Sequence, residues 1–281
     1  MDIITSIAEM QQRMLAARAA GQTIAFVPTM GFLHQGHLSL LEEGRKQGDL
    51  LVLSIFVNPT QFGQGEDFEV YPRDLEQDNA LAEQAGVDMI FAPEAKQMYP
   101  SGYATYVDVE RLSEPLCGAS RPGHFRGVCT VVNKLFNIVQ PDVALFGRKD
   151  FQQLAVIRQM VLDLNLPVEV VGMPIVREAD GLALSSRNIY LTAAQRQQGL
   201  TLSAVLRQSA EQAGAGERDA RQLLDAARRQ LEALPEARID YIQICHQATL
   251  QDVAVVDENS VMLLAVFFGP TRLIDNSYLL K

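Results

Sequence analysis

Short apolar runs of strand length alternate with helical patterns through the first two thirds of this chain of 281 residues. Nearly unbroken hydrophobicity in such runs is typical of parallel strands that are covered on both faces. The alternation therefore predicts an α/β fold built on a parallel sheet. The predicted strands lie at 24–27, 49–57, 88–92, 142–146 and 168–176, and the predicted helices lie at 74–85, 128–139 and 151–164.

The stretch from Thr23 to Leu41 combines the first predicted strand with a turn and an amphipathic helix. Pro28 is expected to end the strand. His34 and His37 come at the beginning of the helix, where unpaired backbone N–H groups and the helix dipole favour an anion such as a phosphate. The histidines add donors that can carry positive charge as phosphate charge develops, and Gly31 and Gly36 let the backbone approach a ligand closely. Two incidental surface histidines are the alternative, but the surrounding strand and helix favour a phosphate site.

Polar residues follow other predicted strands, at the edge where open α/β sheets place their ligands. Asn58 and Gln61 follow the second strand, and turn chemistry explains Asn58 before a proline well but explains Gln61 poorly. Lys149 lies in the turn after the fourth strand, where it can either meet a phosphate or remain solvated. Residues 185–188 (SSRN) supply hydroxyl, guanidinium and amide donors, which suit triphosphate oxygens and equally suit a capped turn.

Composition and charge exclude several classes of protein. The net charge of -10 argues against a general nucleic-acid binder, which needs a basic surface, so a local cluster must hold any anion. The three cysteines lack C-x-x-C spacing, which indicates neither a disulfide framework nor a zinc site, and we expect a cytoplasmic protein. Residues 1–20, with Ser6 and Glu9 at capping-box spacing, indicate a capped helix and not a signal peptide. No apolar run has membrane-spanning length.

The pattern of predicted helices and strands changes near residue 177. Residues 193–235 favour two helices, the first running from Ala193 to about Gln212 after a Thr192–Gln195 capping box, and strand-like runs follow at 239–245, 261–268 and 273–280. A block of helices followed by strands predicts a second, smaller α+β domain. We therefore expect a nucleotide-binding domain over 1–176 and a carboxy-terminal domain over 177–281 that covers the active site.

Two irregular segments, 62–73 and 93–123, are candidates for lids over a reactive intermediate. A strand is expected within the second of them, at 105–109. Arg121 and His124 lie at its end, beside a glycine. A cation and an imidazole in a loop are more often solvated than functional, so the sequence assigns them no role.

Five strings carry a resemblance to a known family, and they are VPTMGFLHQGH, FVNPTQF, YPRD, RPGHFRGVCTVVNKLFNIVQPDVALFGRKDFQQ and LSSRN. In this order, across residues 20–190, the chain resembles the pantoate–β-alanine ligase (pantothenate synthetase) family of the nucleotidyltransferase superfamily. The resemblance implies a Rossmann-like nucleotide-binding domain, ATP and Mg²⁺ as cofactors, pantoate and β-alanine as substrates, and a homodimer. It implies no nucleic-acid or membrane partner.

The resemblance also implies a two-step reaction. Pantoate would attack the α-phosphate of ATP to give pantoyl adenylate and pyrophosphate, and β-alanine would then displace AMP to form the amide. Such chemistry needs stabilisation of charge on a phosphoryl group and no protein nucleophile. His37 would take the acid role, and Gln61 and Gln153 would hold pantoate, since amides can hydrogen-bond hydroxyl and carboxylate groups together.

By the same resemblance, the site residues fall into four groups. The catalytic residues would be His37, His34, Lys149 and Arg187. The ATP-binding residues would be Met30, Gly31, His34, Gly36, His37, Gly147, Lys149, Asp150, Val176, Leu184, Ser185, Ser186 and Arg187. The residues at pantoate or β-alanine would be Gln61, Gln153, Asn58 and Tyr71. Asp78 would be a weak candidate for Mg²⁺ bound through ATP, and Arg148 is not carried over from the family pattern.

Three other functions remain as alternatives. A nucleotidylyltransferase acting on another small acceptor would need a second anion-binding cluster, whereas Gln61 and Gln153 suit an uncharged polyol. A non-catalytic nucleotide sensor would not need Lys149 together with residues 185–187. A metal-dependent hydrolase is disfavoured, because no third-ligand spacing accompanies the two histidines.

Overall fold

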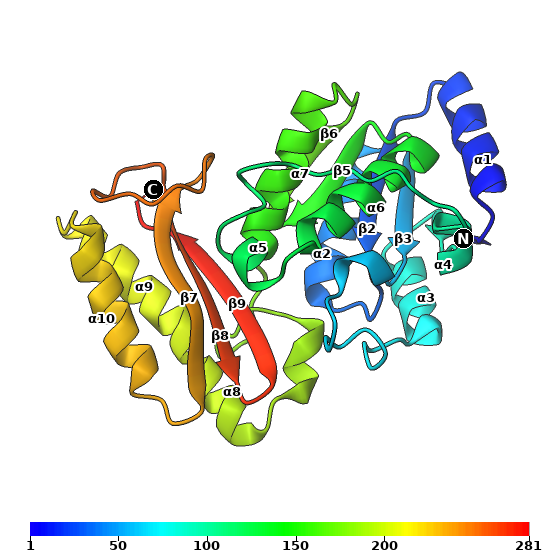
Figure 1. The fold of residues 1–281 in the computed structure, drawn as a ribbon. Helices are drawn as coiled ribbons and strands as arrows, with labels where there is room; N and C mark the ends of the chain where they lie inside the picture. Colours follow the sequence, from blue (N-terminus) through cyan, green and yellow to red (C-terminus); the bar gives the residue numbers. More distant parts are fainter. Residues whose placement is uncertain (281) are drawn as a thin grey trace.

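The computed structural model describes residues 1–280 and consists of two sheets with their helices (Figure 1). The larger sheet carries the first two thirds of the chain, and a three-stranded sheet with long helices on one face carries the last third. The strands of the large sheet are β1 (Asp2–Ile4), β2 (Ile24–Thr29), β3 (Leu50–Ile55), β4 (Met89–Phe91), β5 (Val143–Gly147) and β6 (Glu169–Met173). The strands of the small sheet are β7 (Ala237–His246), β8 (Ser260–Phe268) and β9 (Thr271–Tyr278).

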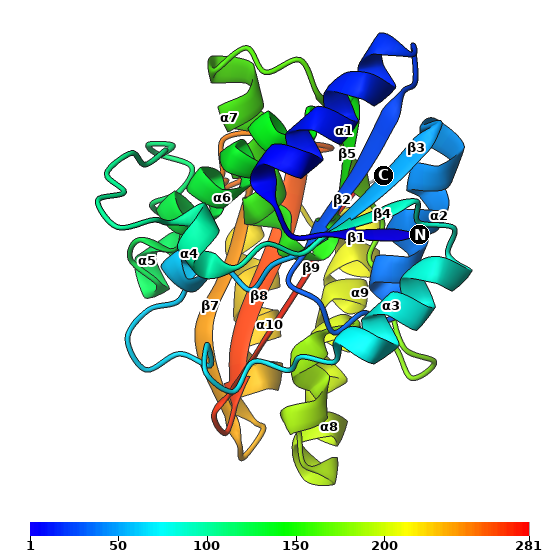
Figure 2. The same cartoon turned by 90° about the vertical axis from the view of Figure 1, so that its right-hand side faces the viewer.

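Helices connect and cover these strands (Figure 2). The helices of the first part are α1 (Ile7–Ala19), α2 (Gln35–Gln47), α3 (Leu75–Gln84), α4 (Ala95–Met98), α5 (Cys117–Ser120), α6 (His124–Val139) and α7 (Phe151–Asp163). Those of the second part are α8 (Ala193–Gly199), α9 (Thr201–Gly214) and α10 (Ala220–Glu232). Three short 3₁₀ helices are η1 (Pro59–Gln61), η2 (Arg148–Asp150) and η3 (Ser186–Tyr190). Within residues 1–280, no helix combines the length and hydrophobicity needed to cross a bilayer.

The large sheet is parallel throughout, in the order β1-β4-β3-β2-β5-β6. The chain leaves β2 toward β3 and β4 on one side and later returns to place β5 and β6 on the other. This reversal makes a crevice at the carboxyl ends of β2 and β5, which is where open α/β sheets bind ligands. The predicted Rossmann-like sheet and the smaller α+β carboxy-terminal part are both confirmed.

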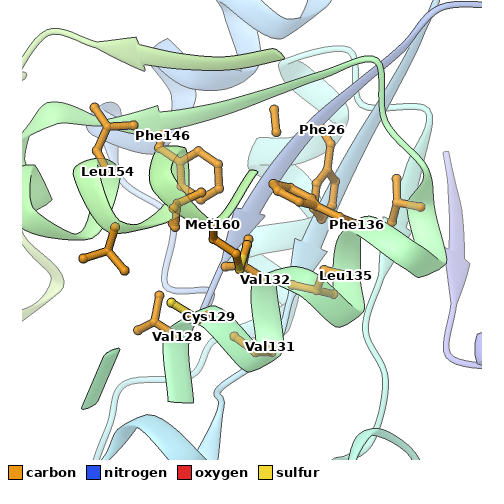
Figure 3. Packing of buried hydrophobic residues seen from close by; sticks show 14 of the residues in the cluster. Phe26, Val128, Cys129, Val131, Val132, Leu135, Phe136, Phe146, Leu154 and Met160 are labelled. Atoms are coloured by element: carbon orange, nitrogen blue, oxygen red, sulfur yellow. The ribbon is translucent and has the colours of Figure 1, made fainter. Parts of the chain in front are cut away.

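Helix α6 builds the core on one face of the large sheet (Figure 3). The ring of Phe136 packs edge-on against both Phe26 of β2 and Phe146 of β5, with ring centroids 6.4 Å apart in each pair. Val128 and Val132 of the same helix also face the crevice. The helix therefore stabilises the neighbouring strands β2 and β5 and forms part of the wall of the crevice.

The two parts of the chain share this core. Phe151, at the beginning of α7, packs edge-on against Tyr278 of β9, with ring centroids 5.9 Å apart. Val261 and Leu263 of β8 belong to the same buried cluster as α6. The small antiparallel sheet is therefore packed against the first part through apolar side chains, beside the crevice.

Several predicted boundaries are wrong for identifiable reasons. Pro28 lies inside β2, because β5 pairs with β2 only at Ala25 and Phe26 and so needs no hydrogen bond from the proline. Residues 105–109 form no strand, since the N–H of Val107 is donated to the hydroxyl of Thr130 on α6 at 3.0 Å. The predicted helix 193–212 is two helices that break at Leu200, after a glycine. The strand β1 was not predicted.

Candidate active site

The crevice at the carboxyl ends of the parallel strands contains a cleft of about 230 Å³. It is bounded by the turns after β2, β3, β5 and β6 and by the first turn of η3. The structure brings sixteen of the eighteen predicted site residues to its wall, leaving out Gly31 and Asp78. The sixteen are Met30, His34, Gly36, His37, Asn58, Gln61, Tyr71, Gly147, Lys149, Asp150, Gln153, Val176, Leu184, Ser185, Ser186 and Arg187.

His34 and His37 cap the helix α2. The Nδ1 atom of His34 accepts a hydrogen bond from the N–H of Gly36 at 3.1 Å, and Nδ1 of His37 accepts one from the N–H of His34 at 3.3 Å. The two rings stack with 4.1 Å between centroids. Because Nδ1 accepts in both rings, each neutral imidazole carries its proton on Nε2. Two N–H donors are therefore available at the cleft.

Both imidazoles are neutral in the ligand-free protein. Burial and the nearby Lys149 lower the pKa of His34 to about 4. Burial, His34 and Lys149 lower the pKa of His37 to about 3. In the free protein a buried site beside an ammonium group disfavours a further charge, so positive charge on these rings, which the sequence suggested for developing phosphate charge, stays a prediction for the ligand-bound state. Their contribution in this state is that of N–H donors.

Asp78, the predicted metal candidate, lies behind the cleft and supports its first turn. Its carboxylate, which is 2% exposed, accepts hydrogen bonds from the N–H groups of Phe32 at 2.8 Å and Leu33 at 2.6 Å. Gly31 and Phe32 both have positive φ, of 83° and 51°. A Cβ on Gly31 would lie 2.9 Å from Asp78, so the turn and the carboxylate fit each other closely. Burial raises the pKa of Asp78.

The amide of Asn58 is held in one orientation. Its Nδ2 donates to the carbonyl oxygen of Gly127 at 3.1 Å, and its Oδ1 accepts from the hydroxyl of Tyr99 at 2.8 Å and from that of Thr60 at 3.0 Å. A flipped amide would set two acceptors against each other at Gly127. Asn58 is 1% exposed, and all of its polar atoms bond to protein. It therefore lines the cleft without a free donor or acceptor for a ligand.

Asn58 in turn fixes Gln61. The second hydrogen of Asn58 Nδ2 is donated to Oε1 of Gln61 at 3.1 Å. The carboxamide of Gln61 therefore has its oxygen toward Asn58 and its NH₂ group on the other side, 3.3 Å from the sulfur of Met30 in the cleft. Gln61 thus presents N–H donors to a ligand, which suits an oxygen acceptor.

The consecutive residues Gln152 and Gln153 have different surroundings. Gln152 is 4% exposed, accepts from the N–H of Cys117 at 3.0 Å and donates to the carbonyl oxygens of Leu112 and Pro115. It therefore ties the irregular segment before α5 to α7. Gln153 lines the cleft and has no side-chain hydrogen bond to another residue in the described part of the chain. Its amide is available to a ligand.

The turn after β5 is held from both sides. Arg148 points away from the cleft and donates from Nε to the carbonyl oxygen of Gly172 on β6 at 2.8 Å. On the other side, the amide of Asn276 on β9 donates to the carbonyl oxygens of Arg148 at 2.9 Å and Lys149 at 3.0 Å. These bonds fix the backbone of the turn and leave the Lys149 side chain at the cleft.

Arg187 enters the cleft from η3 and is already paired. Its Nε and Nη2 donate to the two carboxylate oxygens of Asp67, both at 2.8 Å. Ser185 begins η3 by accepting the N–H of Arg187 at 3.3 Å, and the guanidinium lies 5.7 Å from the ring centroid of Tyr71. Asp67 is in the segment 62–73, so this pair connects the predicted lid to the cationic wall of the cleft.

Arg121 and His124 hold the same segment at the neighbouring residue Glu66. Arg121 donates from Nε and Nη2 to the carboxylate of Glu66, both at 2.6 Å. It also lies 3.1 Å from Nε2 of His124, which must accept, so Nδ1 of that ring donates to the carbonyl oxygen of Gln61 at 2.8 Å. Burial and Arg121 lower the pKa of His124 to about 4. These two residues hold the segment 62–73 and the backbone of Gln61, and they do not line the cleft themselves.

A larger cavity of about 840 Å³ adjoins the cleft and lies between the two parts of the chain. It shares Lys149, Asp150, Gln153, Ser185 and Arg187 with the cleft, so the two spaces are continuous at these residues. Within residues 1–280, no three His, Cys, Asp or Glu side chains gather to hold a metal ion.

The sequence did not identify three residues that shape the site, namely Asp67, Tyr99 and Asn276. Asp67 lay in an acidic loop with no motif. Tyr99 and Asn276 act through contacts across 41 and 127 residues of sequence, and no local pattern reveals such a contact. The order Glu66-Asp67 was the one usable signal, because two adjacent carboxylates shortly after the predicted substrate residue Gln61 invite a search for arginine partners.

Comparisons with known proteins agree with this geometry. The family model for pantoate-beta-alanine ligase matches residues 2–278. A pantothenate synthetase of Syntrophotalea carbinolica is 63% identical over 281 residues, which cover 100% of this chain and 99% of that protein, and one of Geobacter sulfurreducens is 57% identical over 279 residues, with 99% of each covered.

Two solved structures are also similar. The crystal structure of pantothenate synthetase from Thermus thermophilus has a TM-score of 0.94 at 48% identity and covers all of both chains. That of a pantoate-beta-alanine ligase from Francisella tularensis, complexed with beta-gamma ATP and beta-alanine, has a TM-score of 0.82 at 33% identity, with 99% of this chain and 98% of that chain covered. With its parallel sheet, its cleft and these relatives together, the chain belongs to the pantoate–β-alanine ligase family.

Proposed function

We infer that the chain joins pantoate to β-alanine in an ATP-dependent ligation through a pantoyl adenylate, and that both steps take place in the cleft. This assignment rests on one observation, which is that two kinds of polar group line the same cleft. Cationic and N–H donors come from His37, Lys149 and Arg187, amide groups come from Gln61 and Gln153, and all of these side chains line the cleft. The first set suits a polyphosphate, and the second suits a small molecule with hydroxyl and carboxylate oxygens.

In the first step, a carboxylate oxygen of pantoate attacks the α-phosphorus of ATP. A P–O bond forms there, the bond from the α-phosphorus to the bridging oxygen breaks, and pyrophosphate leaves with the electron pair. No proton has to move, so the site needs donors that hold the growing negative charge. The Nε2–H groups of His34 and His37 and the ammonium of Lys149 supply them. Bound phosphate would raise the pKa of each imidazole and strengthen its hydrogen bond.

In the second step, the amine of β-alanine attacks the acyl carbon of pantoyl adenylate. The new C–N bond forms, the C–O bond to the adenylate phosphate breaks, AMP leaves with the electron pair, and one proton of the amine passes to water. The larger cavity supports this order of events, because it meets the cleft at Lys149, Asp150 and Gln153 and gives β-alanine a route to the acyl carbon. The segment 62–73 would limit the access of water to this mixed anhydride.

Mg²⁺ is compatible with the donor set. Asp150 is the one carboxylate on the wall of the cleft within the described residues, and Mg²⁺ in nucleotide sites commonly binds one or two carboxylates together with the phosphates. Bound in this way, Mg²⁺ would neutralise charge on the ATP phosphates. The carboxylate of Asp78 is already engaged with the backbone of Phe32 and Leu33, and we assign it the role of holding the turn.

Three further expectations from the sequence are retained as proposals. We place the boundary between the two domains at residues 176 and 177, which the end of β6 at Met173 and the beginning of η3 at Ser186 support. A homodimer and a cytoplasmic location also remain predictions. Sedimentation equilibrium of the purified protein tests the first of these two, and fractionation of cells tests the second.

The experiment that tests the function is ATP–pyrophosphate exchange with Mg²⁺, with and without D-pantoate, followed by measurement of AMP release on adding β-alanine. We expect exchange that requires pantoate and sustained AMP release only after β-alanine. ATP binding without pantoate-dependent exchange would reject this acceptor. The nucleotidylyltransferase on another small acceptor would then become the better assignment.

A further inference from the structure

Two adjacent acidic residues fasten the segment 62–73 to two different arginines. Glu66 is bonded to Arg121 through two hydrogen bonds of 2.6 Å, and Asp67 is bonded to Arg187 through two of 2.8 Å. Paired bonds of this kind between guanidinium and carboxylate are the strong form of the interaction. The four side chains are between 18% and 29% exposed, so both pairs are shielded from water.

The two pairs differ in their relation to the cleft. Arg187 lines it, whereas Arg121 does not. The carboxylate of Asp67 therefore occupies, in the ligand-free protein, the Nε and Nη2 donors of the guanidinium that we assign to the ATP phosphates. Carboxylate and phosphate both offer arginine a pair of oxygens with matching geometry. The two groups must compete for this edge of Arg187 or share its charge.

We propose that Asp67 is an internal competitor for the polyphosphate site. ATP binding transfers Arg187 from Asp67 to a phosphate, and the departure of pyrophosphate returns it to Asp67. The proposal rests on the proposed function, because it takes Arg187 as a phosphate ligand. The exchange leaves the half-buried guanidinium with an anionic partner in both states, which avoids the large penalty for a buried charge without one. Its consequence is weaker polyphosphate binding and easier release of pyrophosphate.

Calorimetric titration of the full-length protein with magnesium pyrophosphate, in the absence of pantoate, tests this competition without catalysis. The substitution Asp67→Asn removes the charge and keeps the size of the side chain. Competition predicts that Kd for pyrophosphate falls by about fivefold or more. If Asp67 only supports Arg187, Kd should rise in Asp67→Asn, since a poorly held Arg187 would bind pyrophosphate more weakly. An unchanged or higher Kd in Asp67→Asn would overturn the proposal.

Glu66→Gln is the matched control. It removes the same charge one residue away and frees the same segment, but its arginine lies outside the cleft. We expect its Kd for pyrophosphate to stay within about twofold of the wild-type value, because the competition acts only through Arg187. An equal decrease of Kd in both variants would assign the effect to the loss of one negative charge near the cleft or to the loosened segment. This result would overturn competition by Asp67.

A double-mutant cycle isolates the contact itself. In an Arg187→Ala background, the effect of Asp67→Asn on Kd should vanish, and persistence of the effect would again overturn the proposal. Pantoate-dependent ATP–pyrophosphate exchange by the wild-type protein tests the proposed function separately from the role of Asp67. Its absence would overturn the proposed function, whereas its presence with an unaltered Kd in Asp67→Asn would overturn the role of Asp67 alone.

Discussion

The rings of His34 and His37 stack at 4.1 Å while each Nδ1 accepts a backbone hydrogen bond at the first turn of α2. The two histidines therefore begin the helix in the way that a Ser and a Glu usually do. Because capping uses Nδ1, the proton of each neutral ring is on Nε2. Helix capping and the supply of donors to the cleft thus depend on the same pair of side chains.

Gly36→Ala should disturb this pair without unfolding the protein. A Cβ at this position would lie 2.9 Å from Cε1 and 3.0 Å from Nδ1 of His34, so the ring must move. A misplacement near 1 Å costs about 100-fold in rate, whereas alanine gains about 1 kcal/mol of helix propensity over glycine. We expect kcat to fall by about tenfold or more with an unchanged melting temperature. Gly214→Ala, which meets nothing within 4 Å, should keep the wild-type kcat, and normal activity of Gly36→Ala would contradict this arrangement.

His37→Ala and Lys149→Ala should each slow adenylate formation by about 100-fold, which is the usual loss for a single electrostatic donor. His37→Ala also removes an acceptor that caps α2, so its free energy of unfolding should fall by about 1 kcal/mol. The unfolding transition of Lys149→Ala should remain near that of the wild type. The measurement is the rate of pantoate-dependent ATP–pyrophosphate exchange. Lys46→Ala, an exposed lysine near the other end of α2, is the control and should have the wild-type rate. A near-normal rate in either site variant would remove that residue from the mechanism.

Tyr99→Phe should weaken pantoate binding through Asn58 and Gln61. The variant loses the 2.8 Å hydrogen bond to Asn58 Oδ1, and with it part of the restraint on the Gln61 amide. One hydrogen bond contributes about 1 kcal/mol, so we expect KM for pantoate to rise by about fivefold. KM for ATP and kcat should change little.

Tyr106→Phe is the matched control, because this ring is 43% exposed. It should keep the wild-type KM for both substrates. If KM for ATP rose in Tyr99→Phe as much as KM for pantoate, the effect would be a general disturbance of the cleft. The proposed action of Tyr99 on Gln61 through Asn58 would then be rejected.

Asp78→Asn separates support of the turn from metal binding. Phe32 and Leu33 donate to different oxygens of Asp78, and an Asn side chain in the same position replaces one of these oxygens by an NH₂ group, so one N–H loses its acceptor. We expect the free energy of unfolding to fall by about 1–3 kcal/mol, measured by urea titration. The Mg²⁺ concentration for half-maximal activity should not change. A raised Mg²⁺ requirement with normal stability would restore Asp78 as a metal ligand, and Glu76→Gln on the same helix is the control.

The free energy of unfolding should decrease as the pH falls from 7.5 to 5. His34 and His124 have a pKa of about 4 and His37 of about 3 in the folded protein, against about 6.5 when unfolded. Below pH 6.5 the unfolded chain therefore binds more protons, and each histidine removes on the order of 1–2 kcal/mol at pH 5. Urea unfolding at several pH values measures this loss. His124→Gln should reduce the slope, and a slope equal to that of the wild type would contradict the lowered pKa of this residue.

Local patterns in the sequence predicted much of the fold. Continuous apolar runs located five of the six parallel strands, because a strand covered on both faces must be apolar along its length. Capping signals located the beginnings of α1 at Ser6 and α8 at Thr192. The sequence also predicted the edge of the sheet that carries the cleft, since turns after parallel strands meet at one edge. It missed β1, whose three residues are a strand only because β4 lies beside them.

The sequence by itself determined which chemical groups reach the cleft, since His34, His37, Lys149 and Arg187 follow strands or begin helices in local motifs. The tertiary structure decided their state. Burial keeps the two imidazoles neutral, Asn58 turns the Gln61 amide, and Asp67 holds Arg187 before any ligand arrives. The physical reason is that protonation, amide orientation and ion pairing depend on which distant groups lie within about 3 Å, and sequence spacing does not encode those distances.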